Sequence, residues 1–278
     1  MKKGWVMALT GVSLFAGTVT WSAFKKVSAY GKTVSNIELG KNKPDHQERA
    51  RLFFDTQAPY SISVEAPVEV ELVPGFNGVE LLGDTSLMRT LNVSTGWSNG
   101  ATSVDIGVYR LEEDGSTNLY QTDSPEWIAL REAHIVVRIG LGDDDSRQWE
   151  HRDLTFTGCS RVKTSSPLKA TDMYLSFFKT DSAQVNVQVD NLYVYFLSQA
   201  FKSTDLIKLE GHCDRILVER LVGGTFDATA LDARDFYIQR LKDANVRIRA
   251  SRLAHGRDIE NCKIEVEGNP TFKKIEER

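Results

Sequence analysis

The sequence predicts an all-β protein built as a parallel β-helix, or β-solenoid, and three observations lead to this fold class. Residues 211–250 divide into four consecutive blocks of ten in which the same places hold apolar residues. Further apolar pairs recur at intervals of about ten from residue 154 onward. No segment beyond the amino terminus shows the 3.6-residue spacing of an amphipathic helix. Strands with corners that recur at this interval must stack on one another to bury their apolar faces.

Each block of ten is interpreted as one strand followed by one corner, with the inward side chains at fixed places. The register slips by one residue near Glu210, where we expect an altered corner. The first place holds Gly211, Leu221, Leu231 and Leu241, the sixth Ile216, Phe226, Phe236 and Val246, and the eighth Val218, Ala228, Ile238 and Ile248.

The chain before the repeats contains strands of less regular spacing. Residues 62–72 alternate apolar and polar side chains, which predicts one half-buried strand in which Pro67 marks an edge or a bulge. Residues 30–50 are polar and are expected to be a linker, and the charged residues 275–278 are expected to be a frayed tail. Between them, residues 51–150 supply amino-terminal strands and residues 151–274 supply the regular repeats. Further strands are expected at 79–82, 91–93, 104–108, 135–139 and 264–266.

The amino terminus has the pattern of an export signal. Lys2 and Lys3 precede a mostly apolar stretch over residues 5–24, which Lys25 and Lys26 follow. Residues 1–29 are therefore a signal peptide cleaved after Ala29, or an uncleaved helix that anchors the chain in a membrane, because the stretch is about 20 residues long. Both alternatives predict an exported protein, in the periplasm or at the cell surface.

The net charge predicts no nucleic-acid partner, and the spacing of the cysteines predicts no cysteine metal site. Residues 1–29 carry four lysines and no acid, so the remainder has a net charge of −8 instead of −4. Because this remainder would repel phosphates and its basic residues are scattered, we expect no nucleic-acid partner. Cys159, Cys213 and Cys262 have no metal-like spacing and are expected to be free, largely buried thiols.

Three stretches resemble the bacterial envelope family of candidate auto-transporter adhesins with a head GIN domain. The similarity is carried by residues 64–93, by the corners Thr157-Gly158-Cys159-Ser160 and Glu210-Gly211-His212-Cys213, and by the ending Val266-Glu267-Gly268-Asn269-Pro270. Together these stretches span residues 51–274. The resemblance implies a right-handed β-helix with two of the ten-residue strands per turn, in the cell envelope, and it supplies no catalytic residue. The chain departs from the family where Cys, His or bulky residues replace glycine corners.

The sequence contains no recognisable catalytic or metal motif, so we expect no enzyme and no cofactor. The acidic run Asp143, Asp144 and Asp145 lacks the spacing of a calcium loop and is expected to be a solvated loop, with a weak cation site as the alternative. The five histidines are isolated and show no metal spacing. Five aspartates near expected corners are interpreted as turn-stabilising residues: Asp214, Asp227, Asp232, Asp235 and Asp243.

Aromatic side chains are the better indication of function. Tyr193 and Tyr195 alternate with inward apolar residues, and Tyr237 stands beside Phe236, so all three are expected to point outward. Tyrosine on a flat β surface can contact a sugar or a protein partner. We therefore predict a non-enzymatic binding or scaffold module that recognises an envelope protein or glycan over a β face. The alternatives are a carbohydrate-active enzyme on the same β-helix and a structural envelope spacer or sensor domain.

Overall fold

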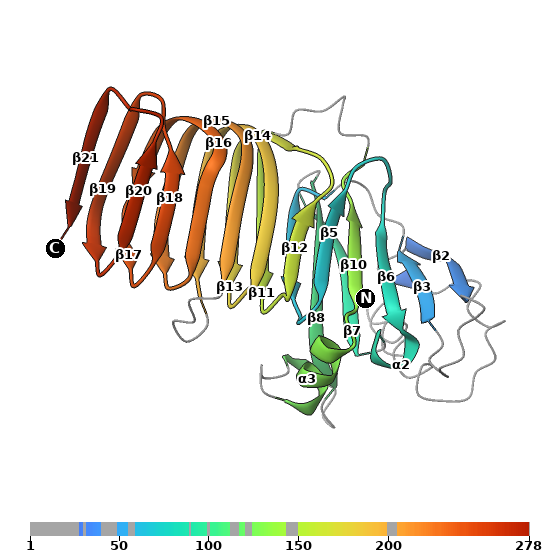
Figure 1. The fold of residues 1–278 in the computed structure, drawn as a ribbon. Coiled ribbons are helices and arrows are strands. Elements are labelled where there is room, and N and C mark those ends of the chain that lie inside the picture. Colours follow the sequence, from blue (N-terminus) through green and yellow to red (C-terminus); the bar gives the residue numbers. More distant parts are fainter. Residues whose placement is uncertain are drawn as a thin grey trace.

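The computed structural model is an all-β solenoid of about five turns with one apolar core along its length (Figure 1). It describes residues 28–29, 32–39, 49–54, 59–88, 90–98, 101–111, 117–119, 124–142, 150–198 and 205–277. The amino-terminal helix expected over residues 5–24 and its flanking lysines lie outside these residues. Within the described part of the chain, no helix is long and apolar enough to cross a membrane.

Two walls of mainly parallel strands enclose the core, and the chain passes from one wall to the other at each corner. The long strands belong to both walls because each bends where consecutive residues point outward, such as Asp190 and Asn191. Wall 1 contains, in spatial order, β6 (Val79–Asp84), β10 (Val136–Gly140), β5 (Glu69–Val73), β12 (Arg161–Thr164), the first halves of β14 (Ser182–Leu197), β15 (Leu206–Val222) and β16 (Thr225–Ile238), β18 (Asn245–Arg249) and β20 (Lys263–Glu267). Wall 2 contains β7 (Leu91–Ser98), β8 (Ala101–Leu111), β4 (Ser61–Glu65), β11 (His151–Thr157), β13 (Leu168–Phe178), the second halves of the long strands, β17 (Leu241–Lys242), β19 (Leu253–Glu260) and β21 (Phe272–Glu277).

One turn of the repeat region contains two of the ten-residue units. Ile216 in β15 lies opposite Phe236 in β16, and Phe226 in β16 lies opposite Val246 in β18. Each pair joins the same place of two blocks that are separated by one intervening block. The residues in the sixth and eighth places of all four blocks are buried. The predicted repeat, its parallel stacking and its inward residues are therefore confirmed.

The core consists of apolar columns that run along the solenoid axis. Phe156, Phe177 and Phe196 lie opposite one another on three successive strands of wall 2, and all three are fully buried. The rings of Phe156 and Phe177 have centroids 5.7 Å apart and planes 19° apart. Because inward residues of successive turns stack in this way, each turn removes apolar surface of its neighbours from water.

The register slip expected near Glu210 is present. The pairing of β15 with β16 shifts between Lys208 and Glu210, and Gly211 has a φ of +102°. A Cβ on Gly211 would lie 2.1 Å from the carbonyl oxygen of Val187 in the preceding turn. Glycine is required here because no other residue combines this backbone conformation with so close an approach.

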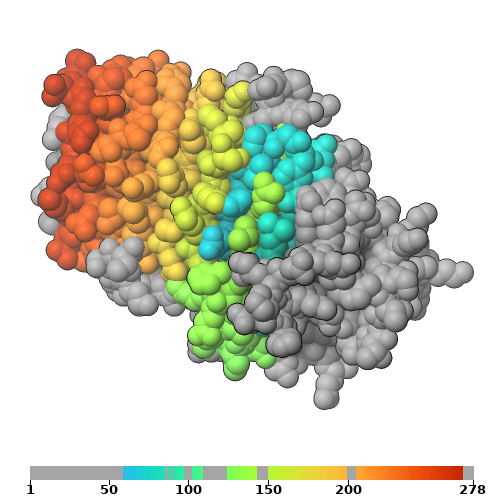
Figure 2. All heavy atoms as spheres, turned by 45° about the vertical axis from the view of Figure 1, so that its right-hand side comes forward, coloured from blue at the N-terminus to red at the C-terminus, as the bar shows by residue number. Residues whose placement is uncertain are grey.

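The amino-terminal strands do not follow one another in space as they do in the sequence. The stretch over residues 62–72, expected to be one strand, is two strands on opposite walls, β4 and β5, and Pro67 lies in the buried corner between them. The later strands β8 and β10 pair with the outer sides of β4 and β5. The green residues of β10 accordingly lie among the cyan residues of β5 and β6, whereas the repeats form bands in sequence order (Figure 2).

A short helix, which the spacing of apolar residues did not predict, lies between β9 (Thr117–Leu119) and β10 in the chain. Helix α3 (Pro125–Glu132) begins after Ser124, whose hydroxyl accepts a hydrogen bond from the backbone N–H of Trp127 at 3.2 Å. Trp127 is buried against the corner glycine Gly158, where a Cβ would lie 2.4 Å from the indole ring. A single buried ring and Leu130 anchor this helix, so it lacks the repeated apolar stripe that a longer helix would need.

Both ends of the described chain contain more strand than expected. Within the stretch expected to be a linker, β2 (Lys32–Leu39) pairs with β3 (Arg49–Phe54), which pairs with β6. At the carboxyl end, the chain does not leave the solenoid at residue 275, where the tail was expected to begin, because Ile275 and Glu277 of β21 still pair with β19 in parallel. The remaining described elements are β1 (Ser28–Ala29), α2 (Thr85–Met88) and β9 (Thr117–Leu119).

Candidate functional site

The three tyrosines predicted to bind a partner lie on the outer surface of wall 2. Tyr193 lies opposite Tyr174 on one side and Leu217 on the other, and Leu217 lies opposite Tyr237 in the next turn. Tyr195 is two residues beyond Tyr193 on the same strand and therefore points to the same side. The twenty-residue turn thus brings together side chains that are far apart in the sequence.

Tyr193 and Tyr237 belong to a longer column of rings that the sequence analysis missed in part. Tyr60 stacks on His151 with centroids 5.3 Å apart, His151 contacts Tyr174 at 4.8 Å, and Tyr174 stacks on Tyr193 at 4.3 Å with planes 9° apart. Beyond Leu217, the rings of Tyr237 and His255 are 6.4 Å apart. We call this set the ring column: Tyr60, His151, Tyr174, Tyr193, Leu217, Tyr237 and His255.

A second, shorter group of rings lies beside the ring column. Phe178 and Tyr195 have centroids 5.3 Å apart and planes 45° apart. Arg220 Nη1 donates a hydrogen bond to the Tyr195 hydroxyl at 3.3 Å. Phe178 and Tyr195 are half-buried, because neighbouring turns cover their flanks and leave their outer edges in solvent, whereas Arg220 is exposed. The outer surface of wall 2 therefore combines apolar ring edges with hydroxyl groups.

The Tyr174 hydroxyl stays protonated over the physiological pH range. Burial, the neighbouring Tyr193 and the carboxylate of Asp172 all raise the pKa of this phenol above its ordinary value. A protonated phenol can both donate and accept a hydrogen bond. This part of wall 2 thus presents neutral polar groups in an apolar frame.

Wall 1 carries a column of charged side chains along its outer surface, which we call the ionic column. The sign of the charge mostly alternates from strand to strand. Arg138 pairs with Glu80 at 2.9 Å and with Glu71 at 3.2 Å, and Glu71 also pairs with Lys163. The ionic column consists of Glu80, Arg138, Glu71, Lys163, Gln184, Lys208, Asp227, Arg247 and Glu265.

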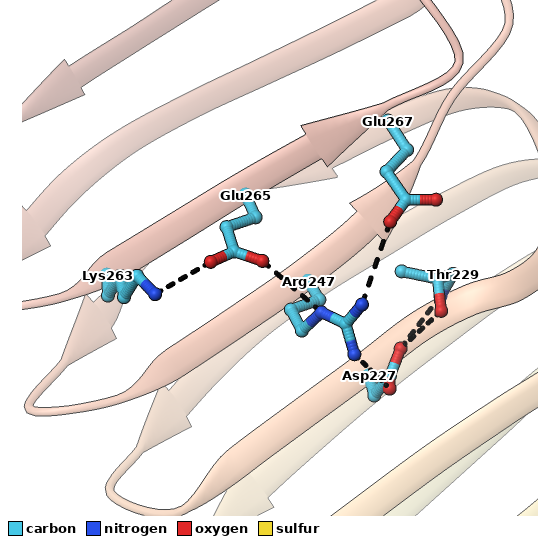
Figure 3. Close-up of polar contacts among 6 residues, drawn as sticks. All are labelled: Asp227, Thr229, Arg247, Lys263, Glu265 and Glu267. Carbon is cyan, nitrogen blue, oxygen red and sulfur yellow. Dashed lines mark hydrogen bonds and ion pairs between the residues drawn. The ribbon is translucent and has the colours of Figure 1, made fainter.

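At its carboxyl end the ionic column becomes a network around Arg247 (Figure 3). The Arg247 guanidinium pairs with Asp227 at 3.2 Å and with Glu265 at 3.3 Å, and it lies 3.7 Å from Glu267. Thr229 donates to the Asp227 carboxylate from its backbone N–H at 3.1 Å and from its hydroxyl at 2.7 Å. Burial alone would raise the pKa of Asp227, but the Thr229 hydrogen bonds and the charge of Arg247 outweigh it and lower that pKa. These charges are largely satisfied within the chain.

Comparison with solved structures places this solenoid among known folds. A candidate adhesin of Bacteroides fragilis NCTC 9343 matches over 86% of this chain and 96% of its own, with a TM-score of 0.57 and 12% identity. The likeness shows the fold alone. A candidate lipid-binding protein of Parabacteroides distasonis ATCC 8503 matches over 84% of this chain and 98% of its own, with a TM-score of 0.47 and 13% identity. No family model and no curated protein matches the chain.

The acidic run and the three cysteines were further residues for which the sequence made a prediction. Asp143, Asp144 and Asp145 lie outside the described residues, and within those residues no group of three or more His, Cys, Asp or Glu side chains could hold a metal ion. Cys159 and Cys213 are buried and Cys262 is half-buried, and all three are free as expected. Burial raises the pKa of the Cys213 thiol to about 12, and it raises the pKa of Cys159 as well.

Among the aspartates expected at corners, Asp235 has a different role. Its carboxylate is fully buried and accepts two hydrogen bonds from Arg252, one of them from Nε at 2.7 Å. The Arg252 hydrogen bonds lower the pKa of Asp235, with a smaller contribution from Arg234. Asp243 does lie at a corner, with a φ of +52°, and it accepts a hydrogen bond from the Asn261 amide at 2.6 Å.

Proposed function

We propose that this protein is an exported, non-enzymatic module of the bacterial cell envelope that binds a partner through the ring column of wall 2. The observation that carries this proposal is the run of four touching rings from Tyr60 to Tyr193 on one outer surface. Tyrosine contributes large, rigid contact area together with a hydroxyl, and it is enriched among the residues that dominate binding energy.

The contrast between the two walls supports wall 2 as the binding surface. On wall 1, Arg138 and Arg247 each pair with acidic residues of neighbouring strands, so the charges neutralise one another locally. A new partner would gain little from groups that are already paired. On wall 2, the outer edges of the rings and the hydroxyls remain available to a partner.

The stacking geometry favours a protein partner over a glycan. A sugar ring binds best against the face of an aromatic ring, but the faces of Tyr174 and Tyr193 cover each other at 4.3 Å. The ring column therefore offers mainly edges and hydroxyls. One ring face differs. Tyr193 stacks on Tyr174 on one side, but on its other side its neighbour is Leu217, and no ring contact is described there. A glycan would bind there, whereas a protein partner would span several rings.

The cellular setting rests on the amino-terminal sequence and on the head GIN resemblance. Residues 1–29 have the pattern of a signal peptide or membrane anchor, and the candidate adhesin with a similar fold is consistent with a surface role. We also propose that the solenoid winds to the right, as parallel strands joined by crossover connections almost always do.

A carbohydrate-active enzyme on the same solenoid is less well supported. Hydrolysis of a glycoside needs a carboxylic acid that is protonated near neutral pH beside a second carboxylate. Asp227, Asp235 and Glu265 instead pair with Thr229, Arg252 and Lys263 respectively, and their pKa values are lowered. These carboxyl groups are therefore unsuited to donate a proton.

Site-specific photo-cross-linking in intact cells tests the proposal. The photoreactive residue p-benzoylphenylalanine replaces Tyr195 on wall 2 or, as the matched control, the exposed Gln184 on wall 1. We expect a discrete protein adduct from position 195 and none from position 184. The adduct should weaken when Tyr193→Ala is added, because that change shortens the ring column.

Binding to polysaccharide extracted from the envelope distinguishes the glycan alternative. If a sugar ring stacks beside Tyr193, wild type binds the extract and Leu217→Tyr abolishes binding by filling that position. If a protein partner spans the column, Leu217→Tyr preserves the adduct from position 195. The absence of both an adduct and polysaccharide binding would overturn the proposal in favour of a structural spacer.

A further inference from the structure

The carboxyl end of wall 1 is an open strand edge. Strand β20 pairs with β18 on one side, and on its other side no strand of the described residues pairs with it. Its inward residues Ile264 and Val266 are only half-buried, whereas their counterparts one turn earlier, Val246 and Ile248, are buried. The backbone N–H and C=O groups along this edge are available to a further strand.

The outward face of β20 carries charges of both signs, from Lys263, Glu265 and Glu267. Charged side chains, especially lysine, and proline commonly protect an edge strand from pairing with another chain. Lys263 bonds Glu265 of its own strand at 2.7 Å, since it has no neighbour on a following turn. A strand with both signs at alternate places can be complementary to itself.

We propose that a second copy of this chain pairs with β20 in antiparallel fashion, about a twofold axis through Ile264. This register places Lys263 opposite Glu265 of the second copy, and the twofold axis repeats that ion pair. It also places Ile264 opposite its own counterpart and Cys262 opposite Val266, so the half-buried inward side chains cover one another. Such a contact is isologous and closes as a dimer.

Charge selects this register over its neighbour. A register centred on Glu265 would place two Glu265 carboxylates directly opposite each other, which is unfavourable. The ionic column favours the same register. Its last three side chains are Asp227, Arg247 and Glu265 (Figure 3). If the charges continue to alternate, the side chain opposite Glu265 on the next strand is basic. Lys263 of the second copy supplies that base.

Charge-swapped variants of the full chain, kept in a mild detergent because of residues 5–24, test the proposal by analytical ultracentrifugation. We expect wild type to form a concentration-dependent dimer. Lys263→Glu and Glu265→Lys should each weaken it by about tenfold or more, because two attractive pairs become repulsive. An equimolar mixture of the two variants should dimerise again, as should the double variant K263E/E265K. A monomeric wild type, or a mixture that fails to associate, would overturn the proposal.

Disulfide trapping provides a test that does not depend on charge. In an antiparallel pair, residues directly opposite have Cα atoms about 4.5–5.5 Å apart, within the range for a disulfide. In a Cys262→Ser background, Ile264→Cys should form a covalent dimer under oxidation, whereas Arg249→Cys, one turn inside the solenoid, should not. Equal cross-linking from both positions would contradict the twofold axis through Ile264. Circular dichroism of each variant verifies that the solenoid is intact.

Discussion

Tyr174 and Tyr193 stack face to face across one turn of the solenoid, with ring centroids 4.3 Å apart and planes 9° apart. They lie opposite each other because β13 and β14 are parallel and in register at this point. The stack extends through His151 to Tyr60, so one outer surface of the protein carries a continuous row of rings. Each ring stiffens its neighbours, which leaves the hydroxyls and edges in fixed positions for a partner.

Truncation of one ring should affect binding much more than folding. We expect Tyr193→Ala to lower the free energy of unfolding by about 1–2 kcal/mol, from the lost stacking and partial burial. The solenoid should remain folded, because the core residues Val194 and Leu192 on either side are unchanged. Urea denaturation measures the loss, with Gln184→Ala on wall 1 as the control that should leave stability nearly unchanged.

Gly211→Ala should destabilise the solenoid through a specific steric contact. Gly211 has a φ of +102°, and a Cβ there would lie 2.1 Å from the Val187 carbonyl oxygen. We expect a loss of roughly 1–3 kcal/mol from the backbone conformation alone, and a further loss from the contact.

Gly75→Ala is the matched control for that substitution. Gly75 also has a positive φ, +84°, but a Cβ there would have no atom within 4 Å. Denaturation of both variants separates the two contributions. Equal losses would show that the approach of Val187 does not matter.

The buried Asp235 should make stability depend on acid pH. Its folded-state pKa is lowered by the Arg252 hydrogen bonds, so its contribution is fully present above the unfolded pKa of about 3.9 and is lost as pH falls further. We expect Asp235→Asn to cost about 1–3 kcal/mol at pH 7. The difference from wild type should shrink below about pH 4.

Denaturation as a function of pH measures this effect, with the exposed Asp214→Asn as the control. A difference between wild type and Asp235→Asn that stays constant from pH 7 to pH 3 would show that the carboxylate charge contributes nothing.

The three thiols should react in a defined order. Cys159 and Cys213 are fully buried and their pKa values are raised, so almost none of either thiol is ionised near neutral pH. Cys262 is half-buried at the end of the solenoid and should be modified first by a thiol reagent at high dilution. Cys262→Ser should remove this early reaction, and Cys159 and Cys213 should react only after unfolding. The proposed dimer should slow the Cys262 reaction as the protein concentration rises.

The regular part of the fold was predictable from the sequence because apolar residues recur there at the positions that face the core. Apolar residues at the sixth and eighth places of residues 211–250 had to point inward, and the slip near Glu210 marked a real change of register. The amino-terminal half was harder, because β8 and β10 pair outside the earlier strands β4 and β5. Alternation along a strand carries no information on this spatial order, so Pro67 was interpreted as the mark of an edge or a bulge, whereas it lies at a corner.

The candidate site was predictable from the sequence only in part. Tyr193 and Tyr195 alternate on one strand, so their common side followed from the period of two. His151 and Tyr174 belong to the same column but are separated by a turn, and the histidine looked isolated. Tyr174 and Tyr193 are 19 residues apart and Tyr193 and Tyr237 are 44 apart, so a search at about one and two turns of the repeat would have grouped them. The sequence also contained the N-terminal capping pattern of α3, because Ser124 is followed by Pro125 and the acidic Glu126.

The photo-cross-linking yield from position 195 on wall 2, measured in cells with and without Tyr193→Ala, tests the central claim most directly. If the ring column binds a protein partner, position 195 gives a discrete adduct, Tyr193→Ala reduces it strongly, and position 184 on wall 1 gives none. An adduct from wall 1 alone, or an adduct from position 195 that Tyr193→Ala leaves unchanged, would contradict the assignment of wall 2 as the binding surface.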